Sequence, residues 1–500
     1  MTNKFSGWKL FRVVLMLSMT ITAVAQTFRS VASFDTATGV DPGNMSLVQS
    51  IDASLYGTAS LGGNTNCNEP AGCGTVFKVE QTGNVLAVHR FCSQPDCSDG
   101  GSPSVGLIQA VDGNLYGTVP QTEANHGTVF SIHPRGGMTT IYTFCAQPGC
   151  TDGSSPEAAL VQGADGSLYG TTINGGGGGC PQPGCGTVFK LSLSGTFTTL
   201  YSFCSQANCV DGAGPYAGLV QGNDGNFYGT TKLGGDPNCP YNSAGGCGTA
   251  FRITPAGVIT TLHIFEITDG KGPSQLVQGS DGNFYGTTSL GGANSQGTIF
   301  KMGSDGTLTV LYNFLCTRTS CSAGHGPNGS GLIQATDGNF YGASTYGGYS
   351  CGGDQGCGTV FKITSTGALT VVHEFCAHIP CADGSNPTGG LVQATDGNLY
   401  GTTSAGGANN GGTLYALLTK LGPFVAFVNH EGSVGQSVII LGQGFDGTTA
   451  VSFNGTPAVF TVNSPSELTA TVPAGATTGP ATVTTPDGTR TSNVPFVVLP

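Results

Sequence analysis

The sequence predicts an all-β protein: a seven-bladed β-propeller closed by its N-terminal strand, followed by an Ig-like β-sandwich. Three observations lead to this prediction. Gly supplies 84 of the 500 residues and charged residues only 9%, a composition typical of turn-rich β structure rather than of helices. A Tyr-Gly phrase recurs seven times at spacings of 53 to 60 residues. After about residue 420 this period stops and a different strand pattern begins.

The first segment, residues 1–25, is a predicted secretory signal peptide. Lys4, Lys9 and Arg12 precede an apolar run that ends in the small residues "AVA" before Gln26. The run is too short for a membrane span. We therefore expect an exported protein, secreted, on the cell surface or in the periplasm, with no membrane span in the mature chain. Loss of three basic residues and no acidic one changes the formal charge from −12 to −15, which argues against nucleic acid as a partner.

Residues 26–420 are predicted to be the propeller, built from repeats of about 57 residues. Each repeat has a phrase such as "LVQ", then "LYG", then "GTVF", then a β-branched or aromatic run such as "TTLYSF". Gly-rich turns separate these four segments, so each repeat predicts one four-stranded blade. The Tyr of the second phrase is Tyr56, Tyr116, Tyr169, Tyr228, Tyr285, Tyr341 and Tyr400.

The two ends of the repeat region have complementary deficits. The seventh repeat stops near Gly422 without its fourth strand, whereas "FRSVASFD" (28–35) is a fourth strand that precedes the first repeat. Pairing of these two segments would complete the last blade and leave no bare sheet edge. A linear stack of sheets gives no reason for this match.

An Asp-Gly pair separates the first two strands of most repeats and predicts a type I′ hairpin turn. In the first repeat Ala53 replaces the Gly, so that turn should be strained or differently shaped. In an up-and-down blade, the loops after the second and fourth strands emerge at the same end. The cysteine-bearing loops therefore share one end, and the Asp-Gly turns lie at the other.

The 18 cysteines fall into nine close pairs, which predict disulfides because both members of a pair are absent together from the fifth repeat. Five pairs have the pattern C-x4-C: Cys92/Cys97, Cys145/Cys150, Cys204/Cys209, Cys316/Cys321 and Cys376/Cys381. Four lie in the loop after the second strand: Cys67/Cys73, Cys180/Cys185, Cys239/Cys247 and Cys351/Cys357. Zinc is the alternative, but these loops offer two thiols and mostly no His.

The residues of the repeated turn phrase have a structural and a functional interpretation. Its Asp could bind calcium or act as an acid, but a local turn interaction is the simpler reading. Its Tyr could stack on sugars, but packing between blades is favoured, with the following Gly allowing close approach. The Gln of "LVQ" could line a channel, but a hydrogen bond to adjacent backbone is favoured.

A second set of acids, near the C-x4-C loops, provides the candidate binding residues. They lie at the predicted cysteine-bearing end, where a ring of acids could bind a cation or a basic or hydroxylated ligand, although structural turns are the competing interpretation. These residues are Asp99, Asp152, Asp211, Asp269 and Asp383. The sixth repeat breaks the pattern with Ala323, and its Arg318 and His325 are the further candidates.

Catalytic and cofactor motifs give no support for an enzyme. There is no "GxSxG" context, P-loop, "HExxH" or dinucleotide-binding motif, so we expect no catalytic residues, no cofactor and no metal. His89, His263 and His373 share a fourth-strand position held by Tyr in other repeats, which indicates packing. The repeats are also too alike for an active site, which normally makes one or two repeats deviate.

Residues 421–500 predict an Ig-like β-sandwich, and they resemble an IPT/TIG domain through "GQSVIILGQGF", "VSFNG" and "VPAGATTG". The repeats, with "DGN(L/F)YGTT" and "GTVFK", resemble the choice-of-anchor GloVer tandem-repeat proteins over about residues 30–415. That resemblance implies export and surface display, but no activity. Sandwiches of this type are usually interaction modules.

The sequence thus favours an exported binding or adhesion protein whose propeller binds carbohydrate or a protein partner at the cysteine-bearing end. The absence of Trp from the mature chain weakens the carbohydrate reading. The alternatives are an extracellular carbohydrate-active enzyme, a lyase or hydrolase, and a purely structural envelope protein.

Overall fold

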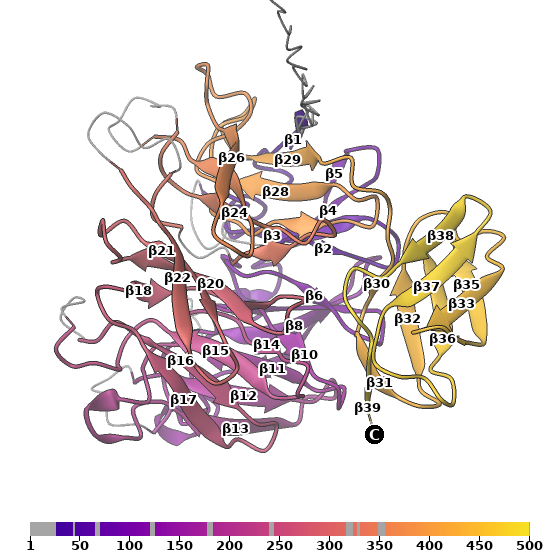
Figure 1. Ribbon diagram of the computed structural model, residues 1–500. Coiled ribbons are helices and arrows are strands. Elements are labelled where there is room, and N and C mark those ends of the chain that lie inside the picture. The colour runs from indigo at the N-terminus through magenta and orange to yellow at the C-terminus, as the bar shows by residue number, and fades with distance from the viewer. Residues whose placement is uncertain are drawn as a thin grey trace, which may run out of the picture.

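The computed structural model describes residues 27–43, 46–65, 71–120, 126–177, 184–239, 245–316, 324–327, 331–348 and 356–499. The predicted signal peptide lies outside the described residues. The described chain is all-β with almost no helix, as predicted (Figure 1). No helix in these ranges is long and apolar enough to cross a membrane.

The repeats form antiparallel sheets in which strands consecutive in sequence lie side by side. The first sheet contains β2 (Val48–Gln49), β3 (Leu55–Ala59), β4 (Thr75–Val79) and β5 (Val85–Arg90). The second contains β6 (Ile108–Gln109), β7 (Leu115–Val119), β8 (Thr128–Ile132) and β9 (Met138–Thr143). The third contains β10 (Val161–Gln162), β11 (Leu168–Thr172), β12 (Thr187–Leu191) and β13 (Phe197–Ser202).

The next three repeats follow the same order. The fourth sheet contains β14 (Val220–Gln221), β15 (Phe227–Thr231), β16 (Thr249–Ile253) and β17 (Ile259–Ile264). The fifth contains β18 (Lys271–Pro273), β19 (Val277–Gln278), β20 (Phe284–Leu290), β21 (Thr298–Met302) and β22 (Leu308–Asn313), with β18 and β19 both paired to β20. The sixth contains β23 (Ile333–Gln334), β24 (Phe340–Ser344), β25 (Thr359–Ile363) and β26 (Leu369–Glu374).

The N-terminal strand completes the sheet of the last repeat. β1 (Thr27–Ser33) pairs antiparallel with β29 (Thr413–Leu418), which continues to β28 (Leu399–Thr403) and β27 (Val392–Gln393). Figure 1 shows the indigo β1 beside the orange β29. The complementary deficits at the two ends of the repeat region therefore meet in one sheet.

Hydrogen bonds link each repeat to its neighbour through the Gln of "LVQ". The Gln side-chain carbonyl accepts a backbone N–H from the turn of the preceding repeat at 2.8–3.2 Å, which confirms the backbone-bonding interpretation. The last bond joins Thr395 N–H to Gln49, so the series returns from the seventh repeat to the first. The apolar clusters lie between adjacent repeats in the same way, and one contains Phe34 and Leu55 together with Leu414.

The Tyr of the turn phrase packs between the sheets, as predicted. Its hydroxyl donates to the Asp four residues earlier at 2.8–3.0 Å in all seven repeats. The ring is fully buried in every repeat except the seventh, where Tyr400 is half-buried. A Cβ on Gly57 would lie 2.6 Å from the Phe77 ring, which explains why Gly follows the Tyr.

The type I′ prediction for the Asp-Gly turns is wrong. In the second repeat the Gly113 N–H bonds to Ala110 O, and Ala110 N–H bonds to Asn114 O, so the loop has three residues rather than two. Gly113 has a φ of +81°, whereas Asp112 is not among the residues with positive φ. The Asp carboxylate accepts the N–H of Asn114 and favours this alternative loop, in which only the third residue is left-handed.

The cysteine loops contain the only helical turns of the described chain, the 3-10 turns η1 (Pro95–Cys97), η2 (Pro148–Cys150) and η3 (Ala207–Cys209). Five predicted disulfides are present: Cys92–Cys97, Cys145–Cys150, Cys204–Cys209, Cys239–Cys247 and Cys376–Cys381.

In each of the other four predicted pairs, only one cysteine falls within the described residues. These four cysteines are disulfide-bonded: Cys73, Cys185, Cys316 and Cys357. Their predicted partners lie outside the described residues: Cys67, Cys180, Cys321 and Cys351. The pairing of Cys316 with Cys321, like the other three pairings of this group, therefore stays a prediction.

The C-terminal segment forms a sandwich of two four-stranded sheets and a two-stranded parallel pair. One sheet contains β30 (Ala426–Phe427), β32 (Ser437–Leu441), β36 (Glu467–Thr471) and β35 (Phe460–Ser464). The other contains β34 (Thr456–Pro457), β33 (Ala450–Phe453), β37 (Ala481–Thr485) and β38 (Gly488–Thr491). The pair is β31 (Glu431–Ser433) with β39 (Val497–Leu499).

The sandwich contacts the Asp-Gly turns of the first and seventh repeats. Ser466 Oγ donates to Ile51 O at 2.8 Å, and Gln443 Nε2 donates to Thr395 Oγ1 at 2.9 Å. Figure 1 shows the yellow sandwich on one side of the repeat sheets. The sandwich therefore occupies the end of the repeats that carries the Asp-Gly turns.

Candidate binding site

The structure places the predicted acids inside their own loops. Asp99, Asp152 and Asp211 are at most 3% exposed. The Asp211 carboxylate accepts the Tyr201 hydroxyl at 2.7 Å and the backbone N–H of Ser205 at 2.9 Å. Asp152 has the equivalent bonds from Tyr142 and Ala146. These carboxylates hold the cysteine loops in place and do not meet one another through any described contact.

The His and Tyr of the fourth strand are the partners of these acids. Nε2 of His263 lies 2.8 Å from Asp269, and Nε2 of His373 lies 2.9 Å from Asp383. His89 pairs with Asp99 in the same way, and burial lowers the pKa of His89 although Asp99 opposes this shift. Packing was the role predicted for these His residues, and their pairing with the acids was not predicted. The sequence contains a signal for this pairing, because a His or Tyr of the fourth strand precedes each of the five Asp residues.

The sixth repeat, the other predicted place for a site, contributes one described candidate. Arg318 lies outside the described residues. His325 stacks on Tyr346 with ring centroids 5.3 Å apart, and burial lowers its pKa. The structure thus gives His325 an aromatic neighbour and no described acid.

Comparison of the repeats with one another reveals a different set of residues. A Pro in each loop after the fourth strand packs on the Gly of a "GTVF" phrase, as Pro103 does on Gly74. The residue after this Pro changes in character from repeat to repeat. It is Gly43, Ser104, Glu157, Tyr216, Ser274, Asn328 and Thr388. A position that varies among nearly identical units is where a single site would be built.

Five of these variable residues or their neighbours line one cavity, here named the central cavity. It consists of two pockets, of about 260 Å³ and about 210 Å³, that share lining residues. Both pockets are lined by Ser104, Glu157, Tyr216, Ala217 and Gln275. The smaller pocket also contacts Ser46 and Gly390, so six of the seven repeats contribute to it.

The central cavity lies at the cysteine-bearing end. The lining of its larger pocket includes Lys232, in a loop after a second strand, and Thr388, in a loop after a fourth strand, together with Ser289 near the end of β20. These two kinds of loop also carry the cysteines. Cys185, after a second strand, lies within 4.8 Å of Cys204 and Cys209, after a fourth strand, so both kinds do emerge together. Because those cysteines form disulfides, they are not available as thiolate ligands for zinc.

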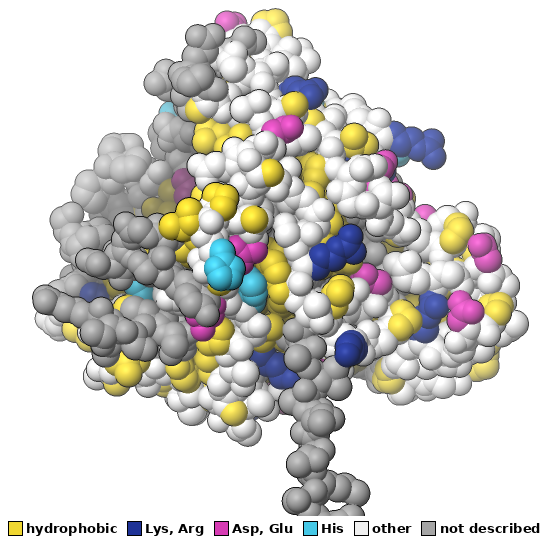
Figure 2. Space-filling view, turned by 90° about the horizontal axis from the view of Figure 1, so that it is seen from above, with side chains coloured by type: hydrophobic (Ala, Val, Ile, Leu, Met, Phe, Trp, Pro, Cys, Tyr) yellow, Lys and Arg dark blue, Asp and Glu magenta, His cyan; other side chains and the backbone are white. Residues whose placement is uncertain are grey.

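Charge in the central cavity comes from one acid and one base. Burial raises the pKa of Glu157, and the nearby Lys232 partly offsets this effect. The Lys232 ammonium lies 4.6 Å from the centroid of the Tyr216 ring. Tyr216 is 41% exposed, whereas the repeated Tyr residues of the turn phrase are nearly all buried. Elsewhere charge is sparse, and Figure 2 shows charged side chains scattered among uncharged ones.

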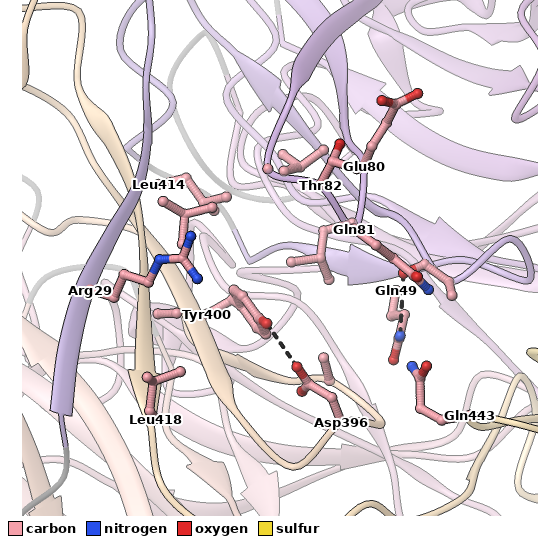
Figure 3. A pocket seen from close by; sticks show the side chains of 17 residues that line it. Arg29, Gln49, Glu80, Gln81, Thr82, Asp396, Tyr400, Leu414, Leu418 and Gln443 are labelled. Atoms are coloured by element: carbon pink, nitrogen blue, oxygen red, sulfur yellow. Dashed lines mark hydrogen bonds between the residues drawn. The ribbon is translucent and has the colours of Figure 1, made fainter.

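A second cavity, of about 250 Å³, lies where the first and seventh repeats meet the sandwich (Figure 3). It contains Arg29, Asp396, Tyr400 and Gln443, and the Tyr400 hydroxyl donates to Asp396 at 2.8 Å. Ala416 stands here where four other repeats have a Lys that pairs with the turn Asp. The short Ala416 side chain leaves room for this cavity at the seam, the junction of the first and seventh repeats. The sandwich lies over the seam and contributes Gln443 to the cavity.

These features define an all-β tandem-repeat protein with a cavity lined by residues of six repeats. The chain belongs to the Gloeobacter/Verrucomicrobia repeat family, whose model matches residues 18–182 and 239–460. An IPT/TIG domain matches residues 424–498. Both resemblances found in the sequence are confirmed. No curated protein matches the chain.

Solved structures similar to this chain are propeller-like and include lyases. A catalytically inactive variant of virginiamycin B lyase from Staphylococcus aureus, with quinupristin, is 14% identical with a TM-score of 0.50. The match covers 78% of this chain and 99% of the lyase. A streptogramin B lyase (13% identity, TM-score 0.49) covers 79% and 97% of the two chains. A luciferin-regenerating enzyme (13%, TM-score 0.38) covers 64% and 91%. At these identities the likeness concerns the fold alone.

Proposed function

We propose that the chain is an exported, seven-bladed propeller closed by β1 that binds carbohydrate in its central cavity. Residues 26–420 form the propeller and residues 421–500 the sandwich, which covers the opposite end. The observation that carries the proposal is the convergence of the variable residues Ser104, Glu157 and Tyr216 on one cavity. Disulfides and export fit together, because an oxidising compartment preserves the cysteine loops.

The chemistry of the central cavity suits a sugar ring better than an apolar ligand. The exposed Tyr216 ring offers a flat surface for the C–H face of a sugar. Ser104, Gln275 and Ser289 offer hydroxyl and amide groups for ring hydroxyls. This aromatic residue was not recognised in the sequence, and it answers the objection that the mature chain lacks Trp.

A saccharide panel tests the proposal. The protein, produced with its disulfides formed, is titrated calorimetrically with oligosaccharides, together with Tyr216→Ala and the control Tyr346→Ala. Tyr346 stacks on His325 and does not line the central cavity. We expect Tyr216→Ala to weaken binding about tenfold or more and Tyr346→Ala to leave it unchanged. Binding that survives Tyr216→Ala, or no binding to any saccharide, would overturn the proposal.

A carbohydrate-active enzyme is the second candidate, favoured by one observation. Glu157, with a raised pKa, lies near the Lys232 ammonium in the same cavity, and such pairs can exchange protons with a substrate. The same saccharides are therefore followed for cleavage, by reducing ends and by ultraviolet absorption of unsaturated products. Cleavage that is lost in Glu157→Gln would favour the enzyme over the binding protein.

A further inference from the structure

Lys232 differs from the lysines at the turn end of the repeats. Lys78, Lys190, Lys301 and Lys362 each pair with the Asp of a turn phrase at 2.6–3.0 Å. Lys232 lines the central cavity, and no carboxylate of the described residues lies within ion-pair distance of it. The Lys232 ammonium is therefore a positive charge without an ion-pair partner in the central cavity of a chain whose net charge is −12.

The surroundings of Lys232 hold its ammonium in place without cancelling its charge. The Tyr216 ring lies 4.6 Å away, a cation–π contact that positions the ammonium at the rim of the aromatic surface. Glu157 is the acid that could neutralise it, but burial disfavours the charged form of that carboxyl. The ammonium therefore still offers donors to a ligand that rests on Tyr216.

The other groups of the central cavity define the rest of the ligand. Ser104, Ser289, Thr388 and Gln275 are uncharged donors and acceptors from three different repeats. A ligand that uses all of them carries several hydroxyls around a ring, with one negative charge at the edge nearest Lys232. A neutral sugar would leave the ammonium without a partner, whereas a nucleotide or polyphosphate would need more than one cation.

We propose that the central cavity is specific for acidic saccharides, in which the carboxylate of a uronic acid residue pairs with Lys232 while its ring lies on Tyr216. This inference rests on the proposed carbohydrate-binding function and specifies its ligand. A sulfated sugar shares the anionic chemistry, and the experiment separates the two sources of charge.

The probes are oligosaccharides matched in everything except charge. Oligomers of galacturonate, of alginate and of hyaluronan are each compared with the product of carboxyl reduction, in which CH2OH replaces the carboxylate. Sulfated galactan oligomers form a third arm. We expect at least one uronate oligomer to bind about tenfold more tightly than its reduced partner, with a preference that shrinks as salt is added. Sulfated oligomers binding more tightly than every uronate would overturn the assignment to a carboxylate.

Two variants assign the preference to Lys232. Lys232→Met keeps an apolar stem of similar length, and we expect it to remove the tenfold preference, so that acidic and reduced oligomers bind equally well. Glu157→Gln removes the neighbouring acid, and we expect uronate binding to become tighter because the ligand carboxylate no longer faces a second acid. Equal binding of acidic and reduced oligomers to the wild-type protein would overturn this inference but leave the binding function standing. Absence of binding to both kinds would overturn the binding function itself.

Discussion

Tyr285 and Asp281 show, at the scale of single residues, what the repeated turn phrase does. The Tyr285 hydroxyl donates to Asp281, Lys301 pairs with the same carboxylate, and Asn283 N–H closes the turn. Burial raises the pKa of Asp281, but the bonds from Lys301, Asn283 and Tyr285 outweigh it and lower the pKa to about 2. This carboxylate therefore stabilises the fold above its ordinary pKa of 3.8 and ceases to do so as the pH falls toward 2.

Ala53 occupies the position in the first repeat where the other six repeats have the Gly of the Asp-Gly turn. It has a φ of +61°, so the first turn keeps the shape of the others at the cost of strain, which is one of the two outcomes predicted from the sequence. We expect Ala53→Gly to raise the free energy of unfolding by about 1 kcal/mol, because relief of left-handed strain exceeds the added chain entropy. Thermal and urea unfolding measure the change.

Gly166, the equivalent residue of the third repeat, provides the reciprocal control. A Cβ there meets no atom within 4 Å, so Gly166→Ala adds strain without a clash. Gly166→Ala should lower the free energy of unfolding by about 1 kcal/mol. If both substitutions leave stability unchanged, the turns are not under the strain that their φ values indicate.

At the scale of elements, the buried Asp of each cysteine loop fixes that loop to the fourth strand. Asp211 accepts from Tyr201, Ser205 and Gln206, and burial with Asp211 raises the pKa of Tyr201 to about 12. We expect Asp211→Ala to lower the free energy of unfolding by about 3 kcal/mol, because two backbone N–H groups and a hydroxyl lose a charged acceptor. Urea unfolding measures this loss.

The exposed Asp305, in the turn between β21 and β22, is the matched control. Its carboxylate bonds to Thr307 within the same turn, so Asp305→Ala should leave the free energy of unfolding close to that of the wild-type protein. Should Asp211→Ala keep full stability and lose saccharide binding instead, the acids of the cysteine loops would be ligands after all.

The repeats, the disulfides and the role of β1 could be predicted because each depends on a local or periodic signal. Cys145 and Cys150 lie five positions apart, and the orphan strand matches a missing one. The Asp–His pairs and the central cavity depend instead on which side chains meet when loops from different repeats converge. Glu157 and Tyr216 carry no motif, and only their variation against the other repeats marks them.

At the scale of the whole molecule, the sandwich joins the two ends of the repeat region. Besides Ser466 and Gln443, Phe424 N–H donates to Thr395 O. Ile51 and Thr395 belong to the first and seventh repeats, which also meet through β1 and Gln49. The contact therefore lies where the first and seventh repeats meet, at the end of the repeats opposite the cysteine loops and the central cavity.

Glu431, on β31 of the sandwich, is a buried acid whose protonation should make the stability of the fold depend on pH. Its side chain is 1% exposed, neither carboxylate oxygen has a hydrogen-bond partner among the described residues, and His430 Nε2 lies 3.9 Å away. Burial, and then repulsion from Asp224 in the turn between β14 and β15, raise the pKa of Glu431 to about 7. Burial lowers the pKa of His430, so both side chains favour their neutral forms.

We expect stability to fall as the pH rises from 4.5 to about 7, because the folded protein keeps a proton on Glu431 that the unfolded chain has already lost. The difference corresponds to about 3 kcal/mol once Glu431 is ionised. Glu431→Gln should match the wild-type protein at pH 4.5 and unfold at a higher temperature at pH 8. Glu467→Gln is the control, since Asn463 already bonds to that carboxylate. Parallel stability curves for Glu431→Gln and the wild-type protein across this range would show that the buried carboxyl does not titrate with folding.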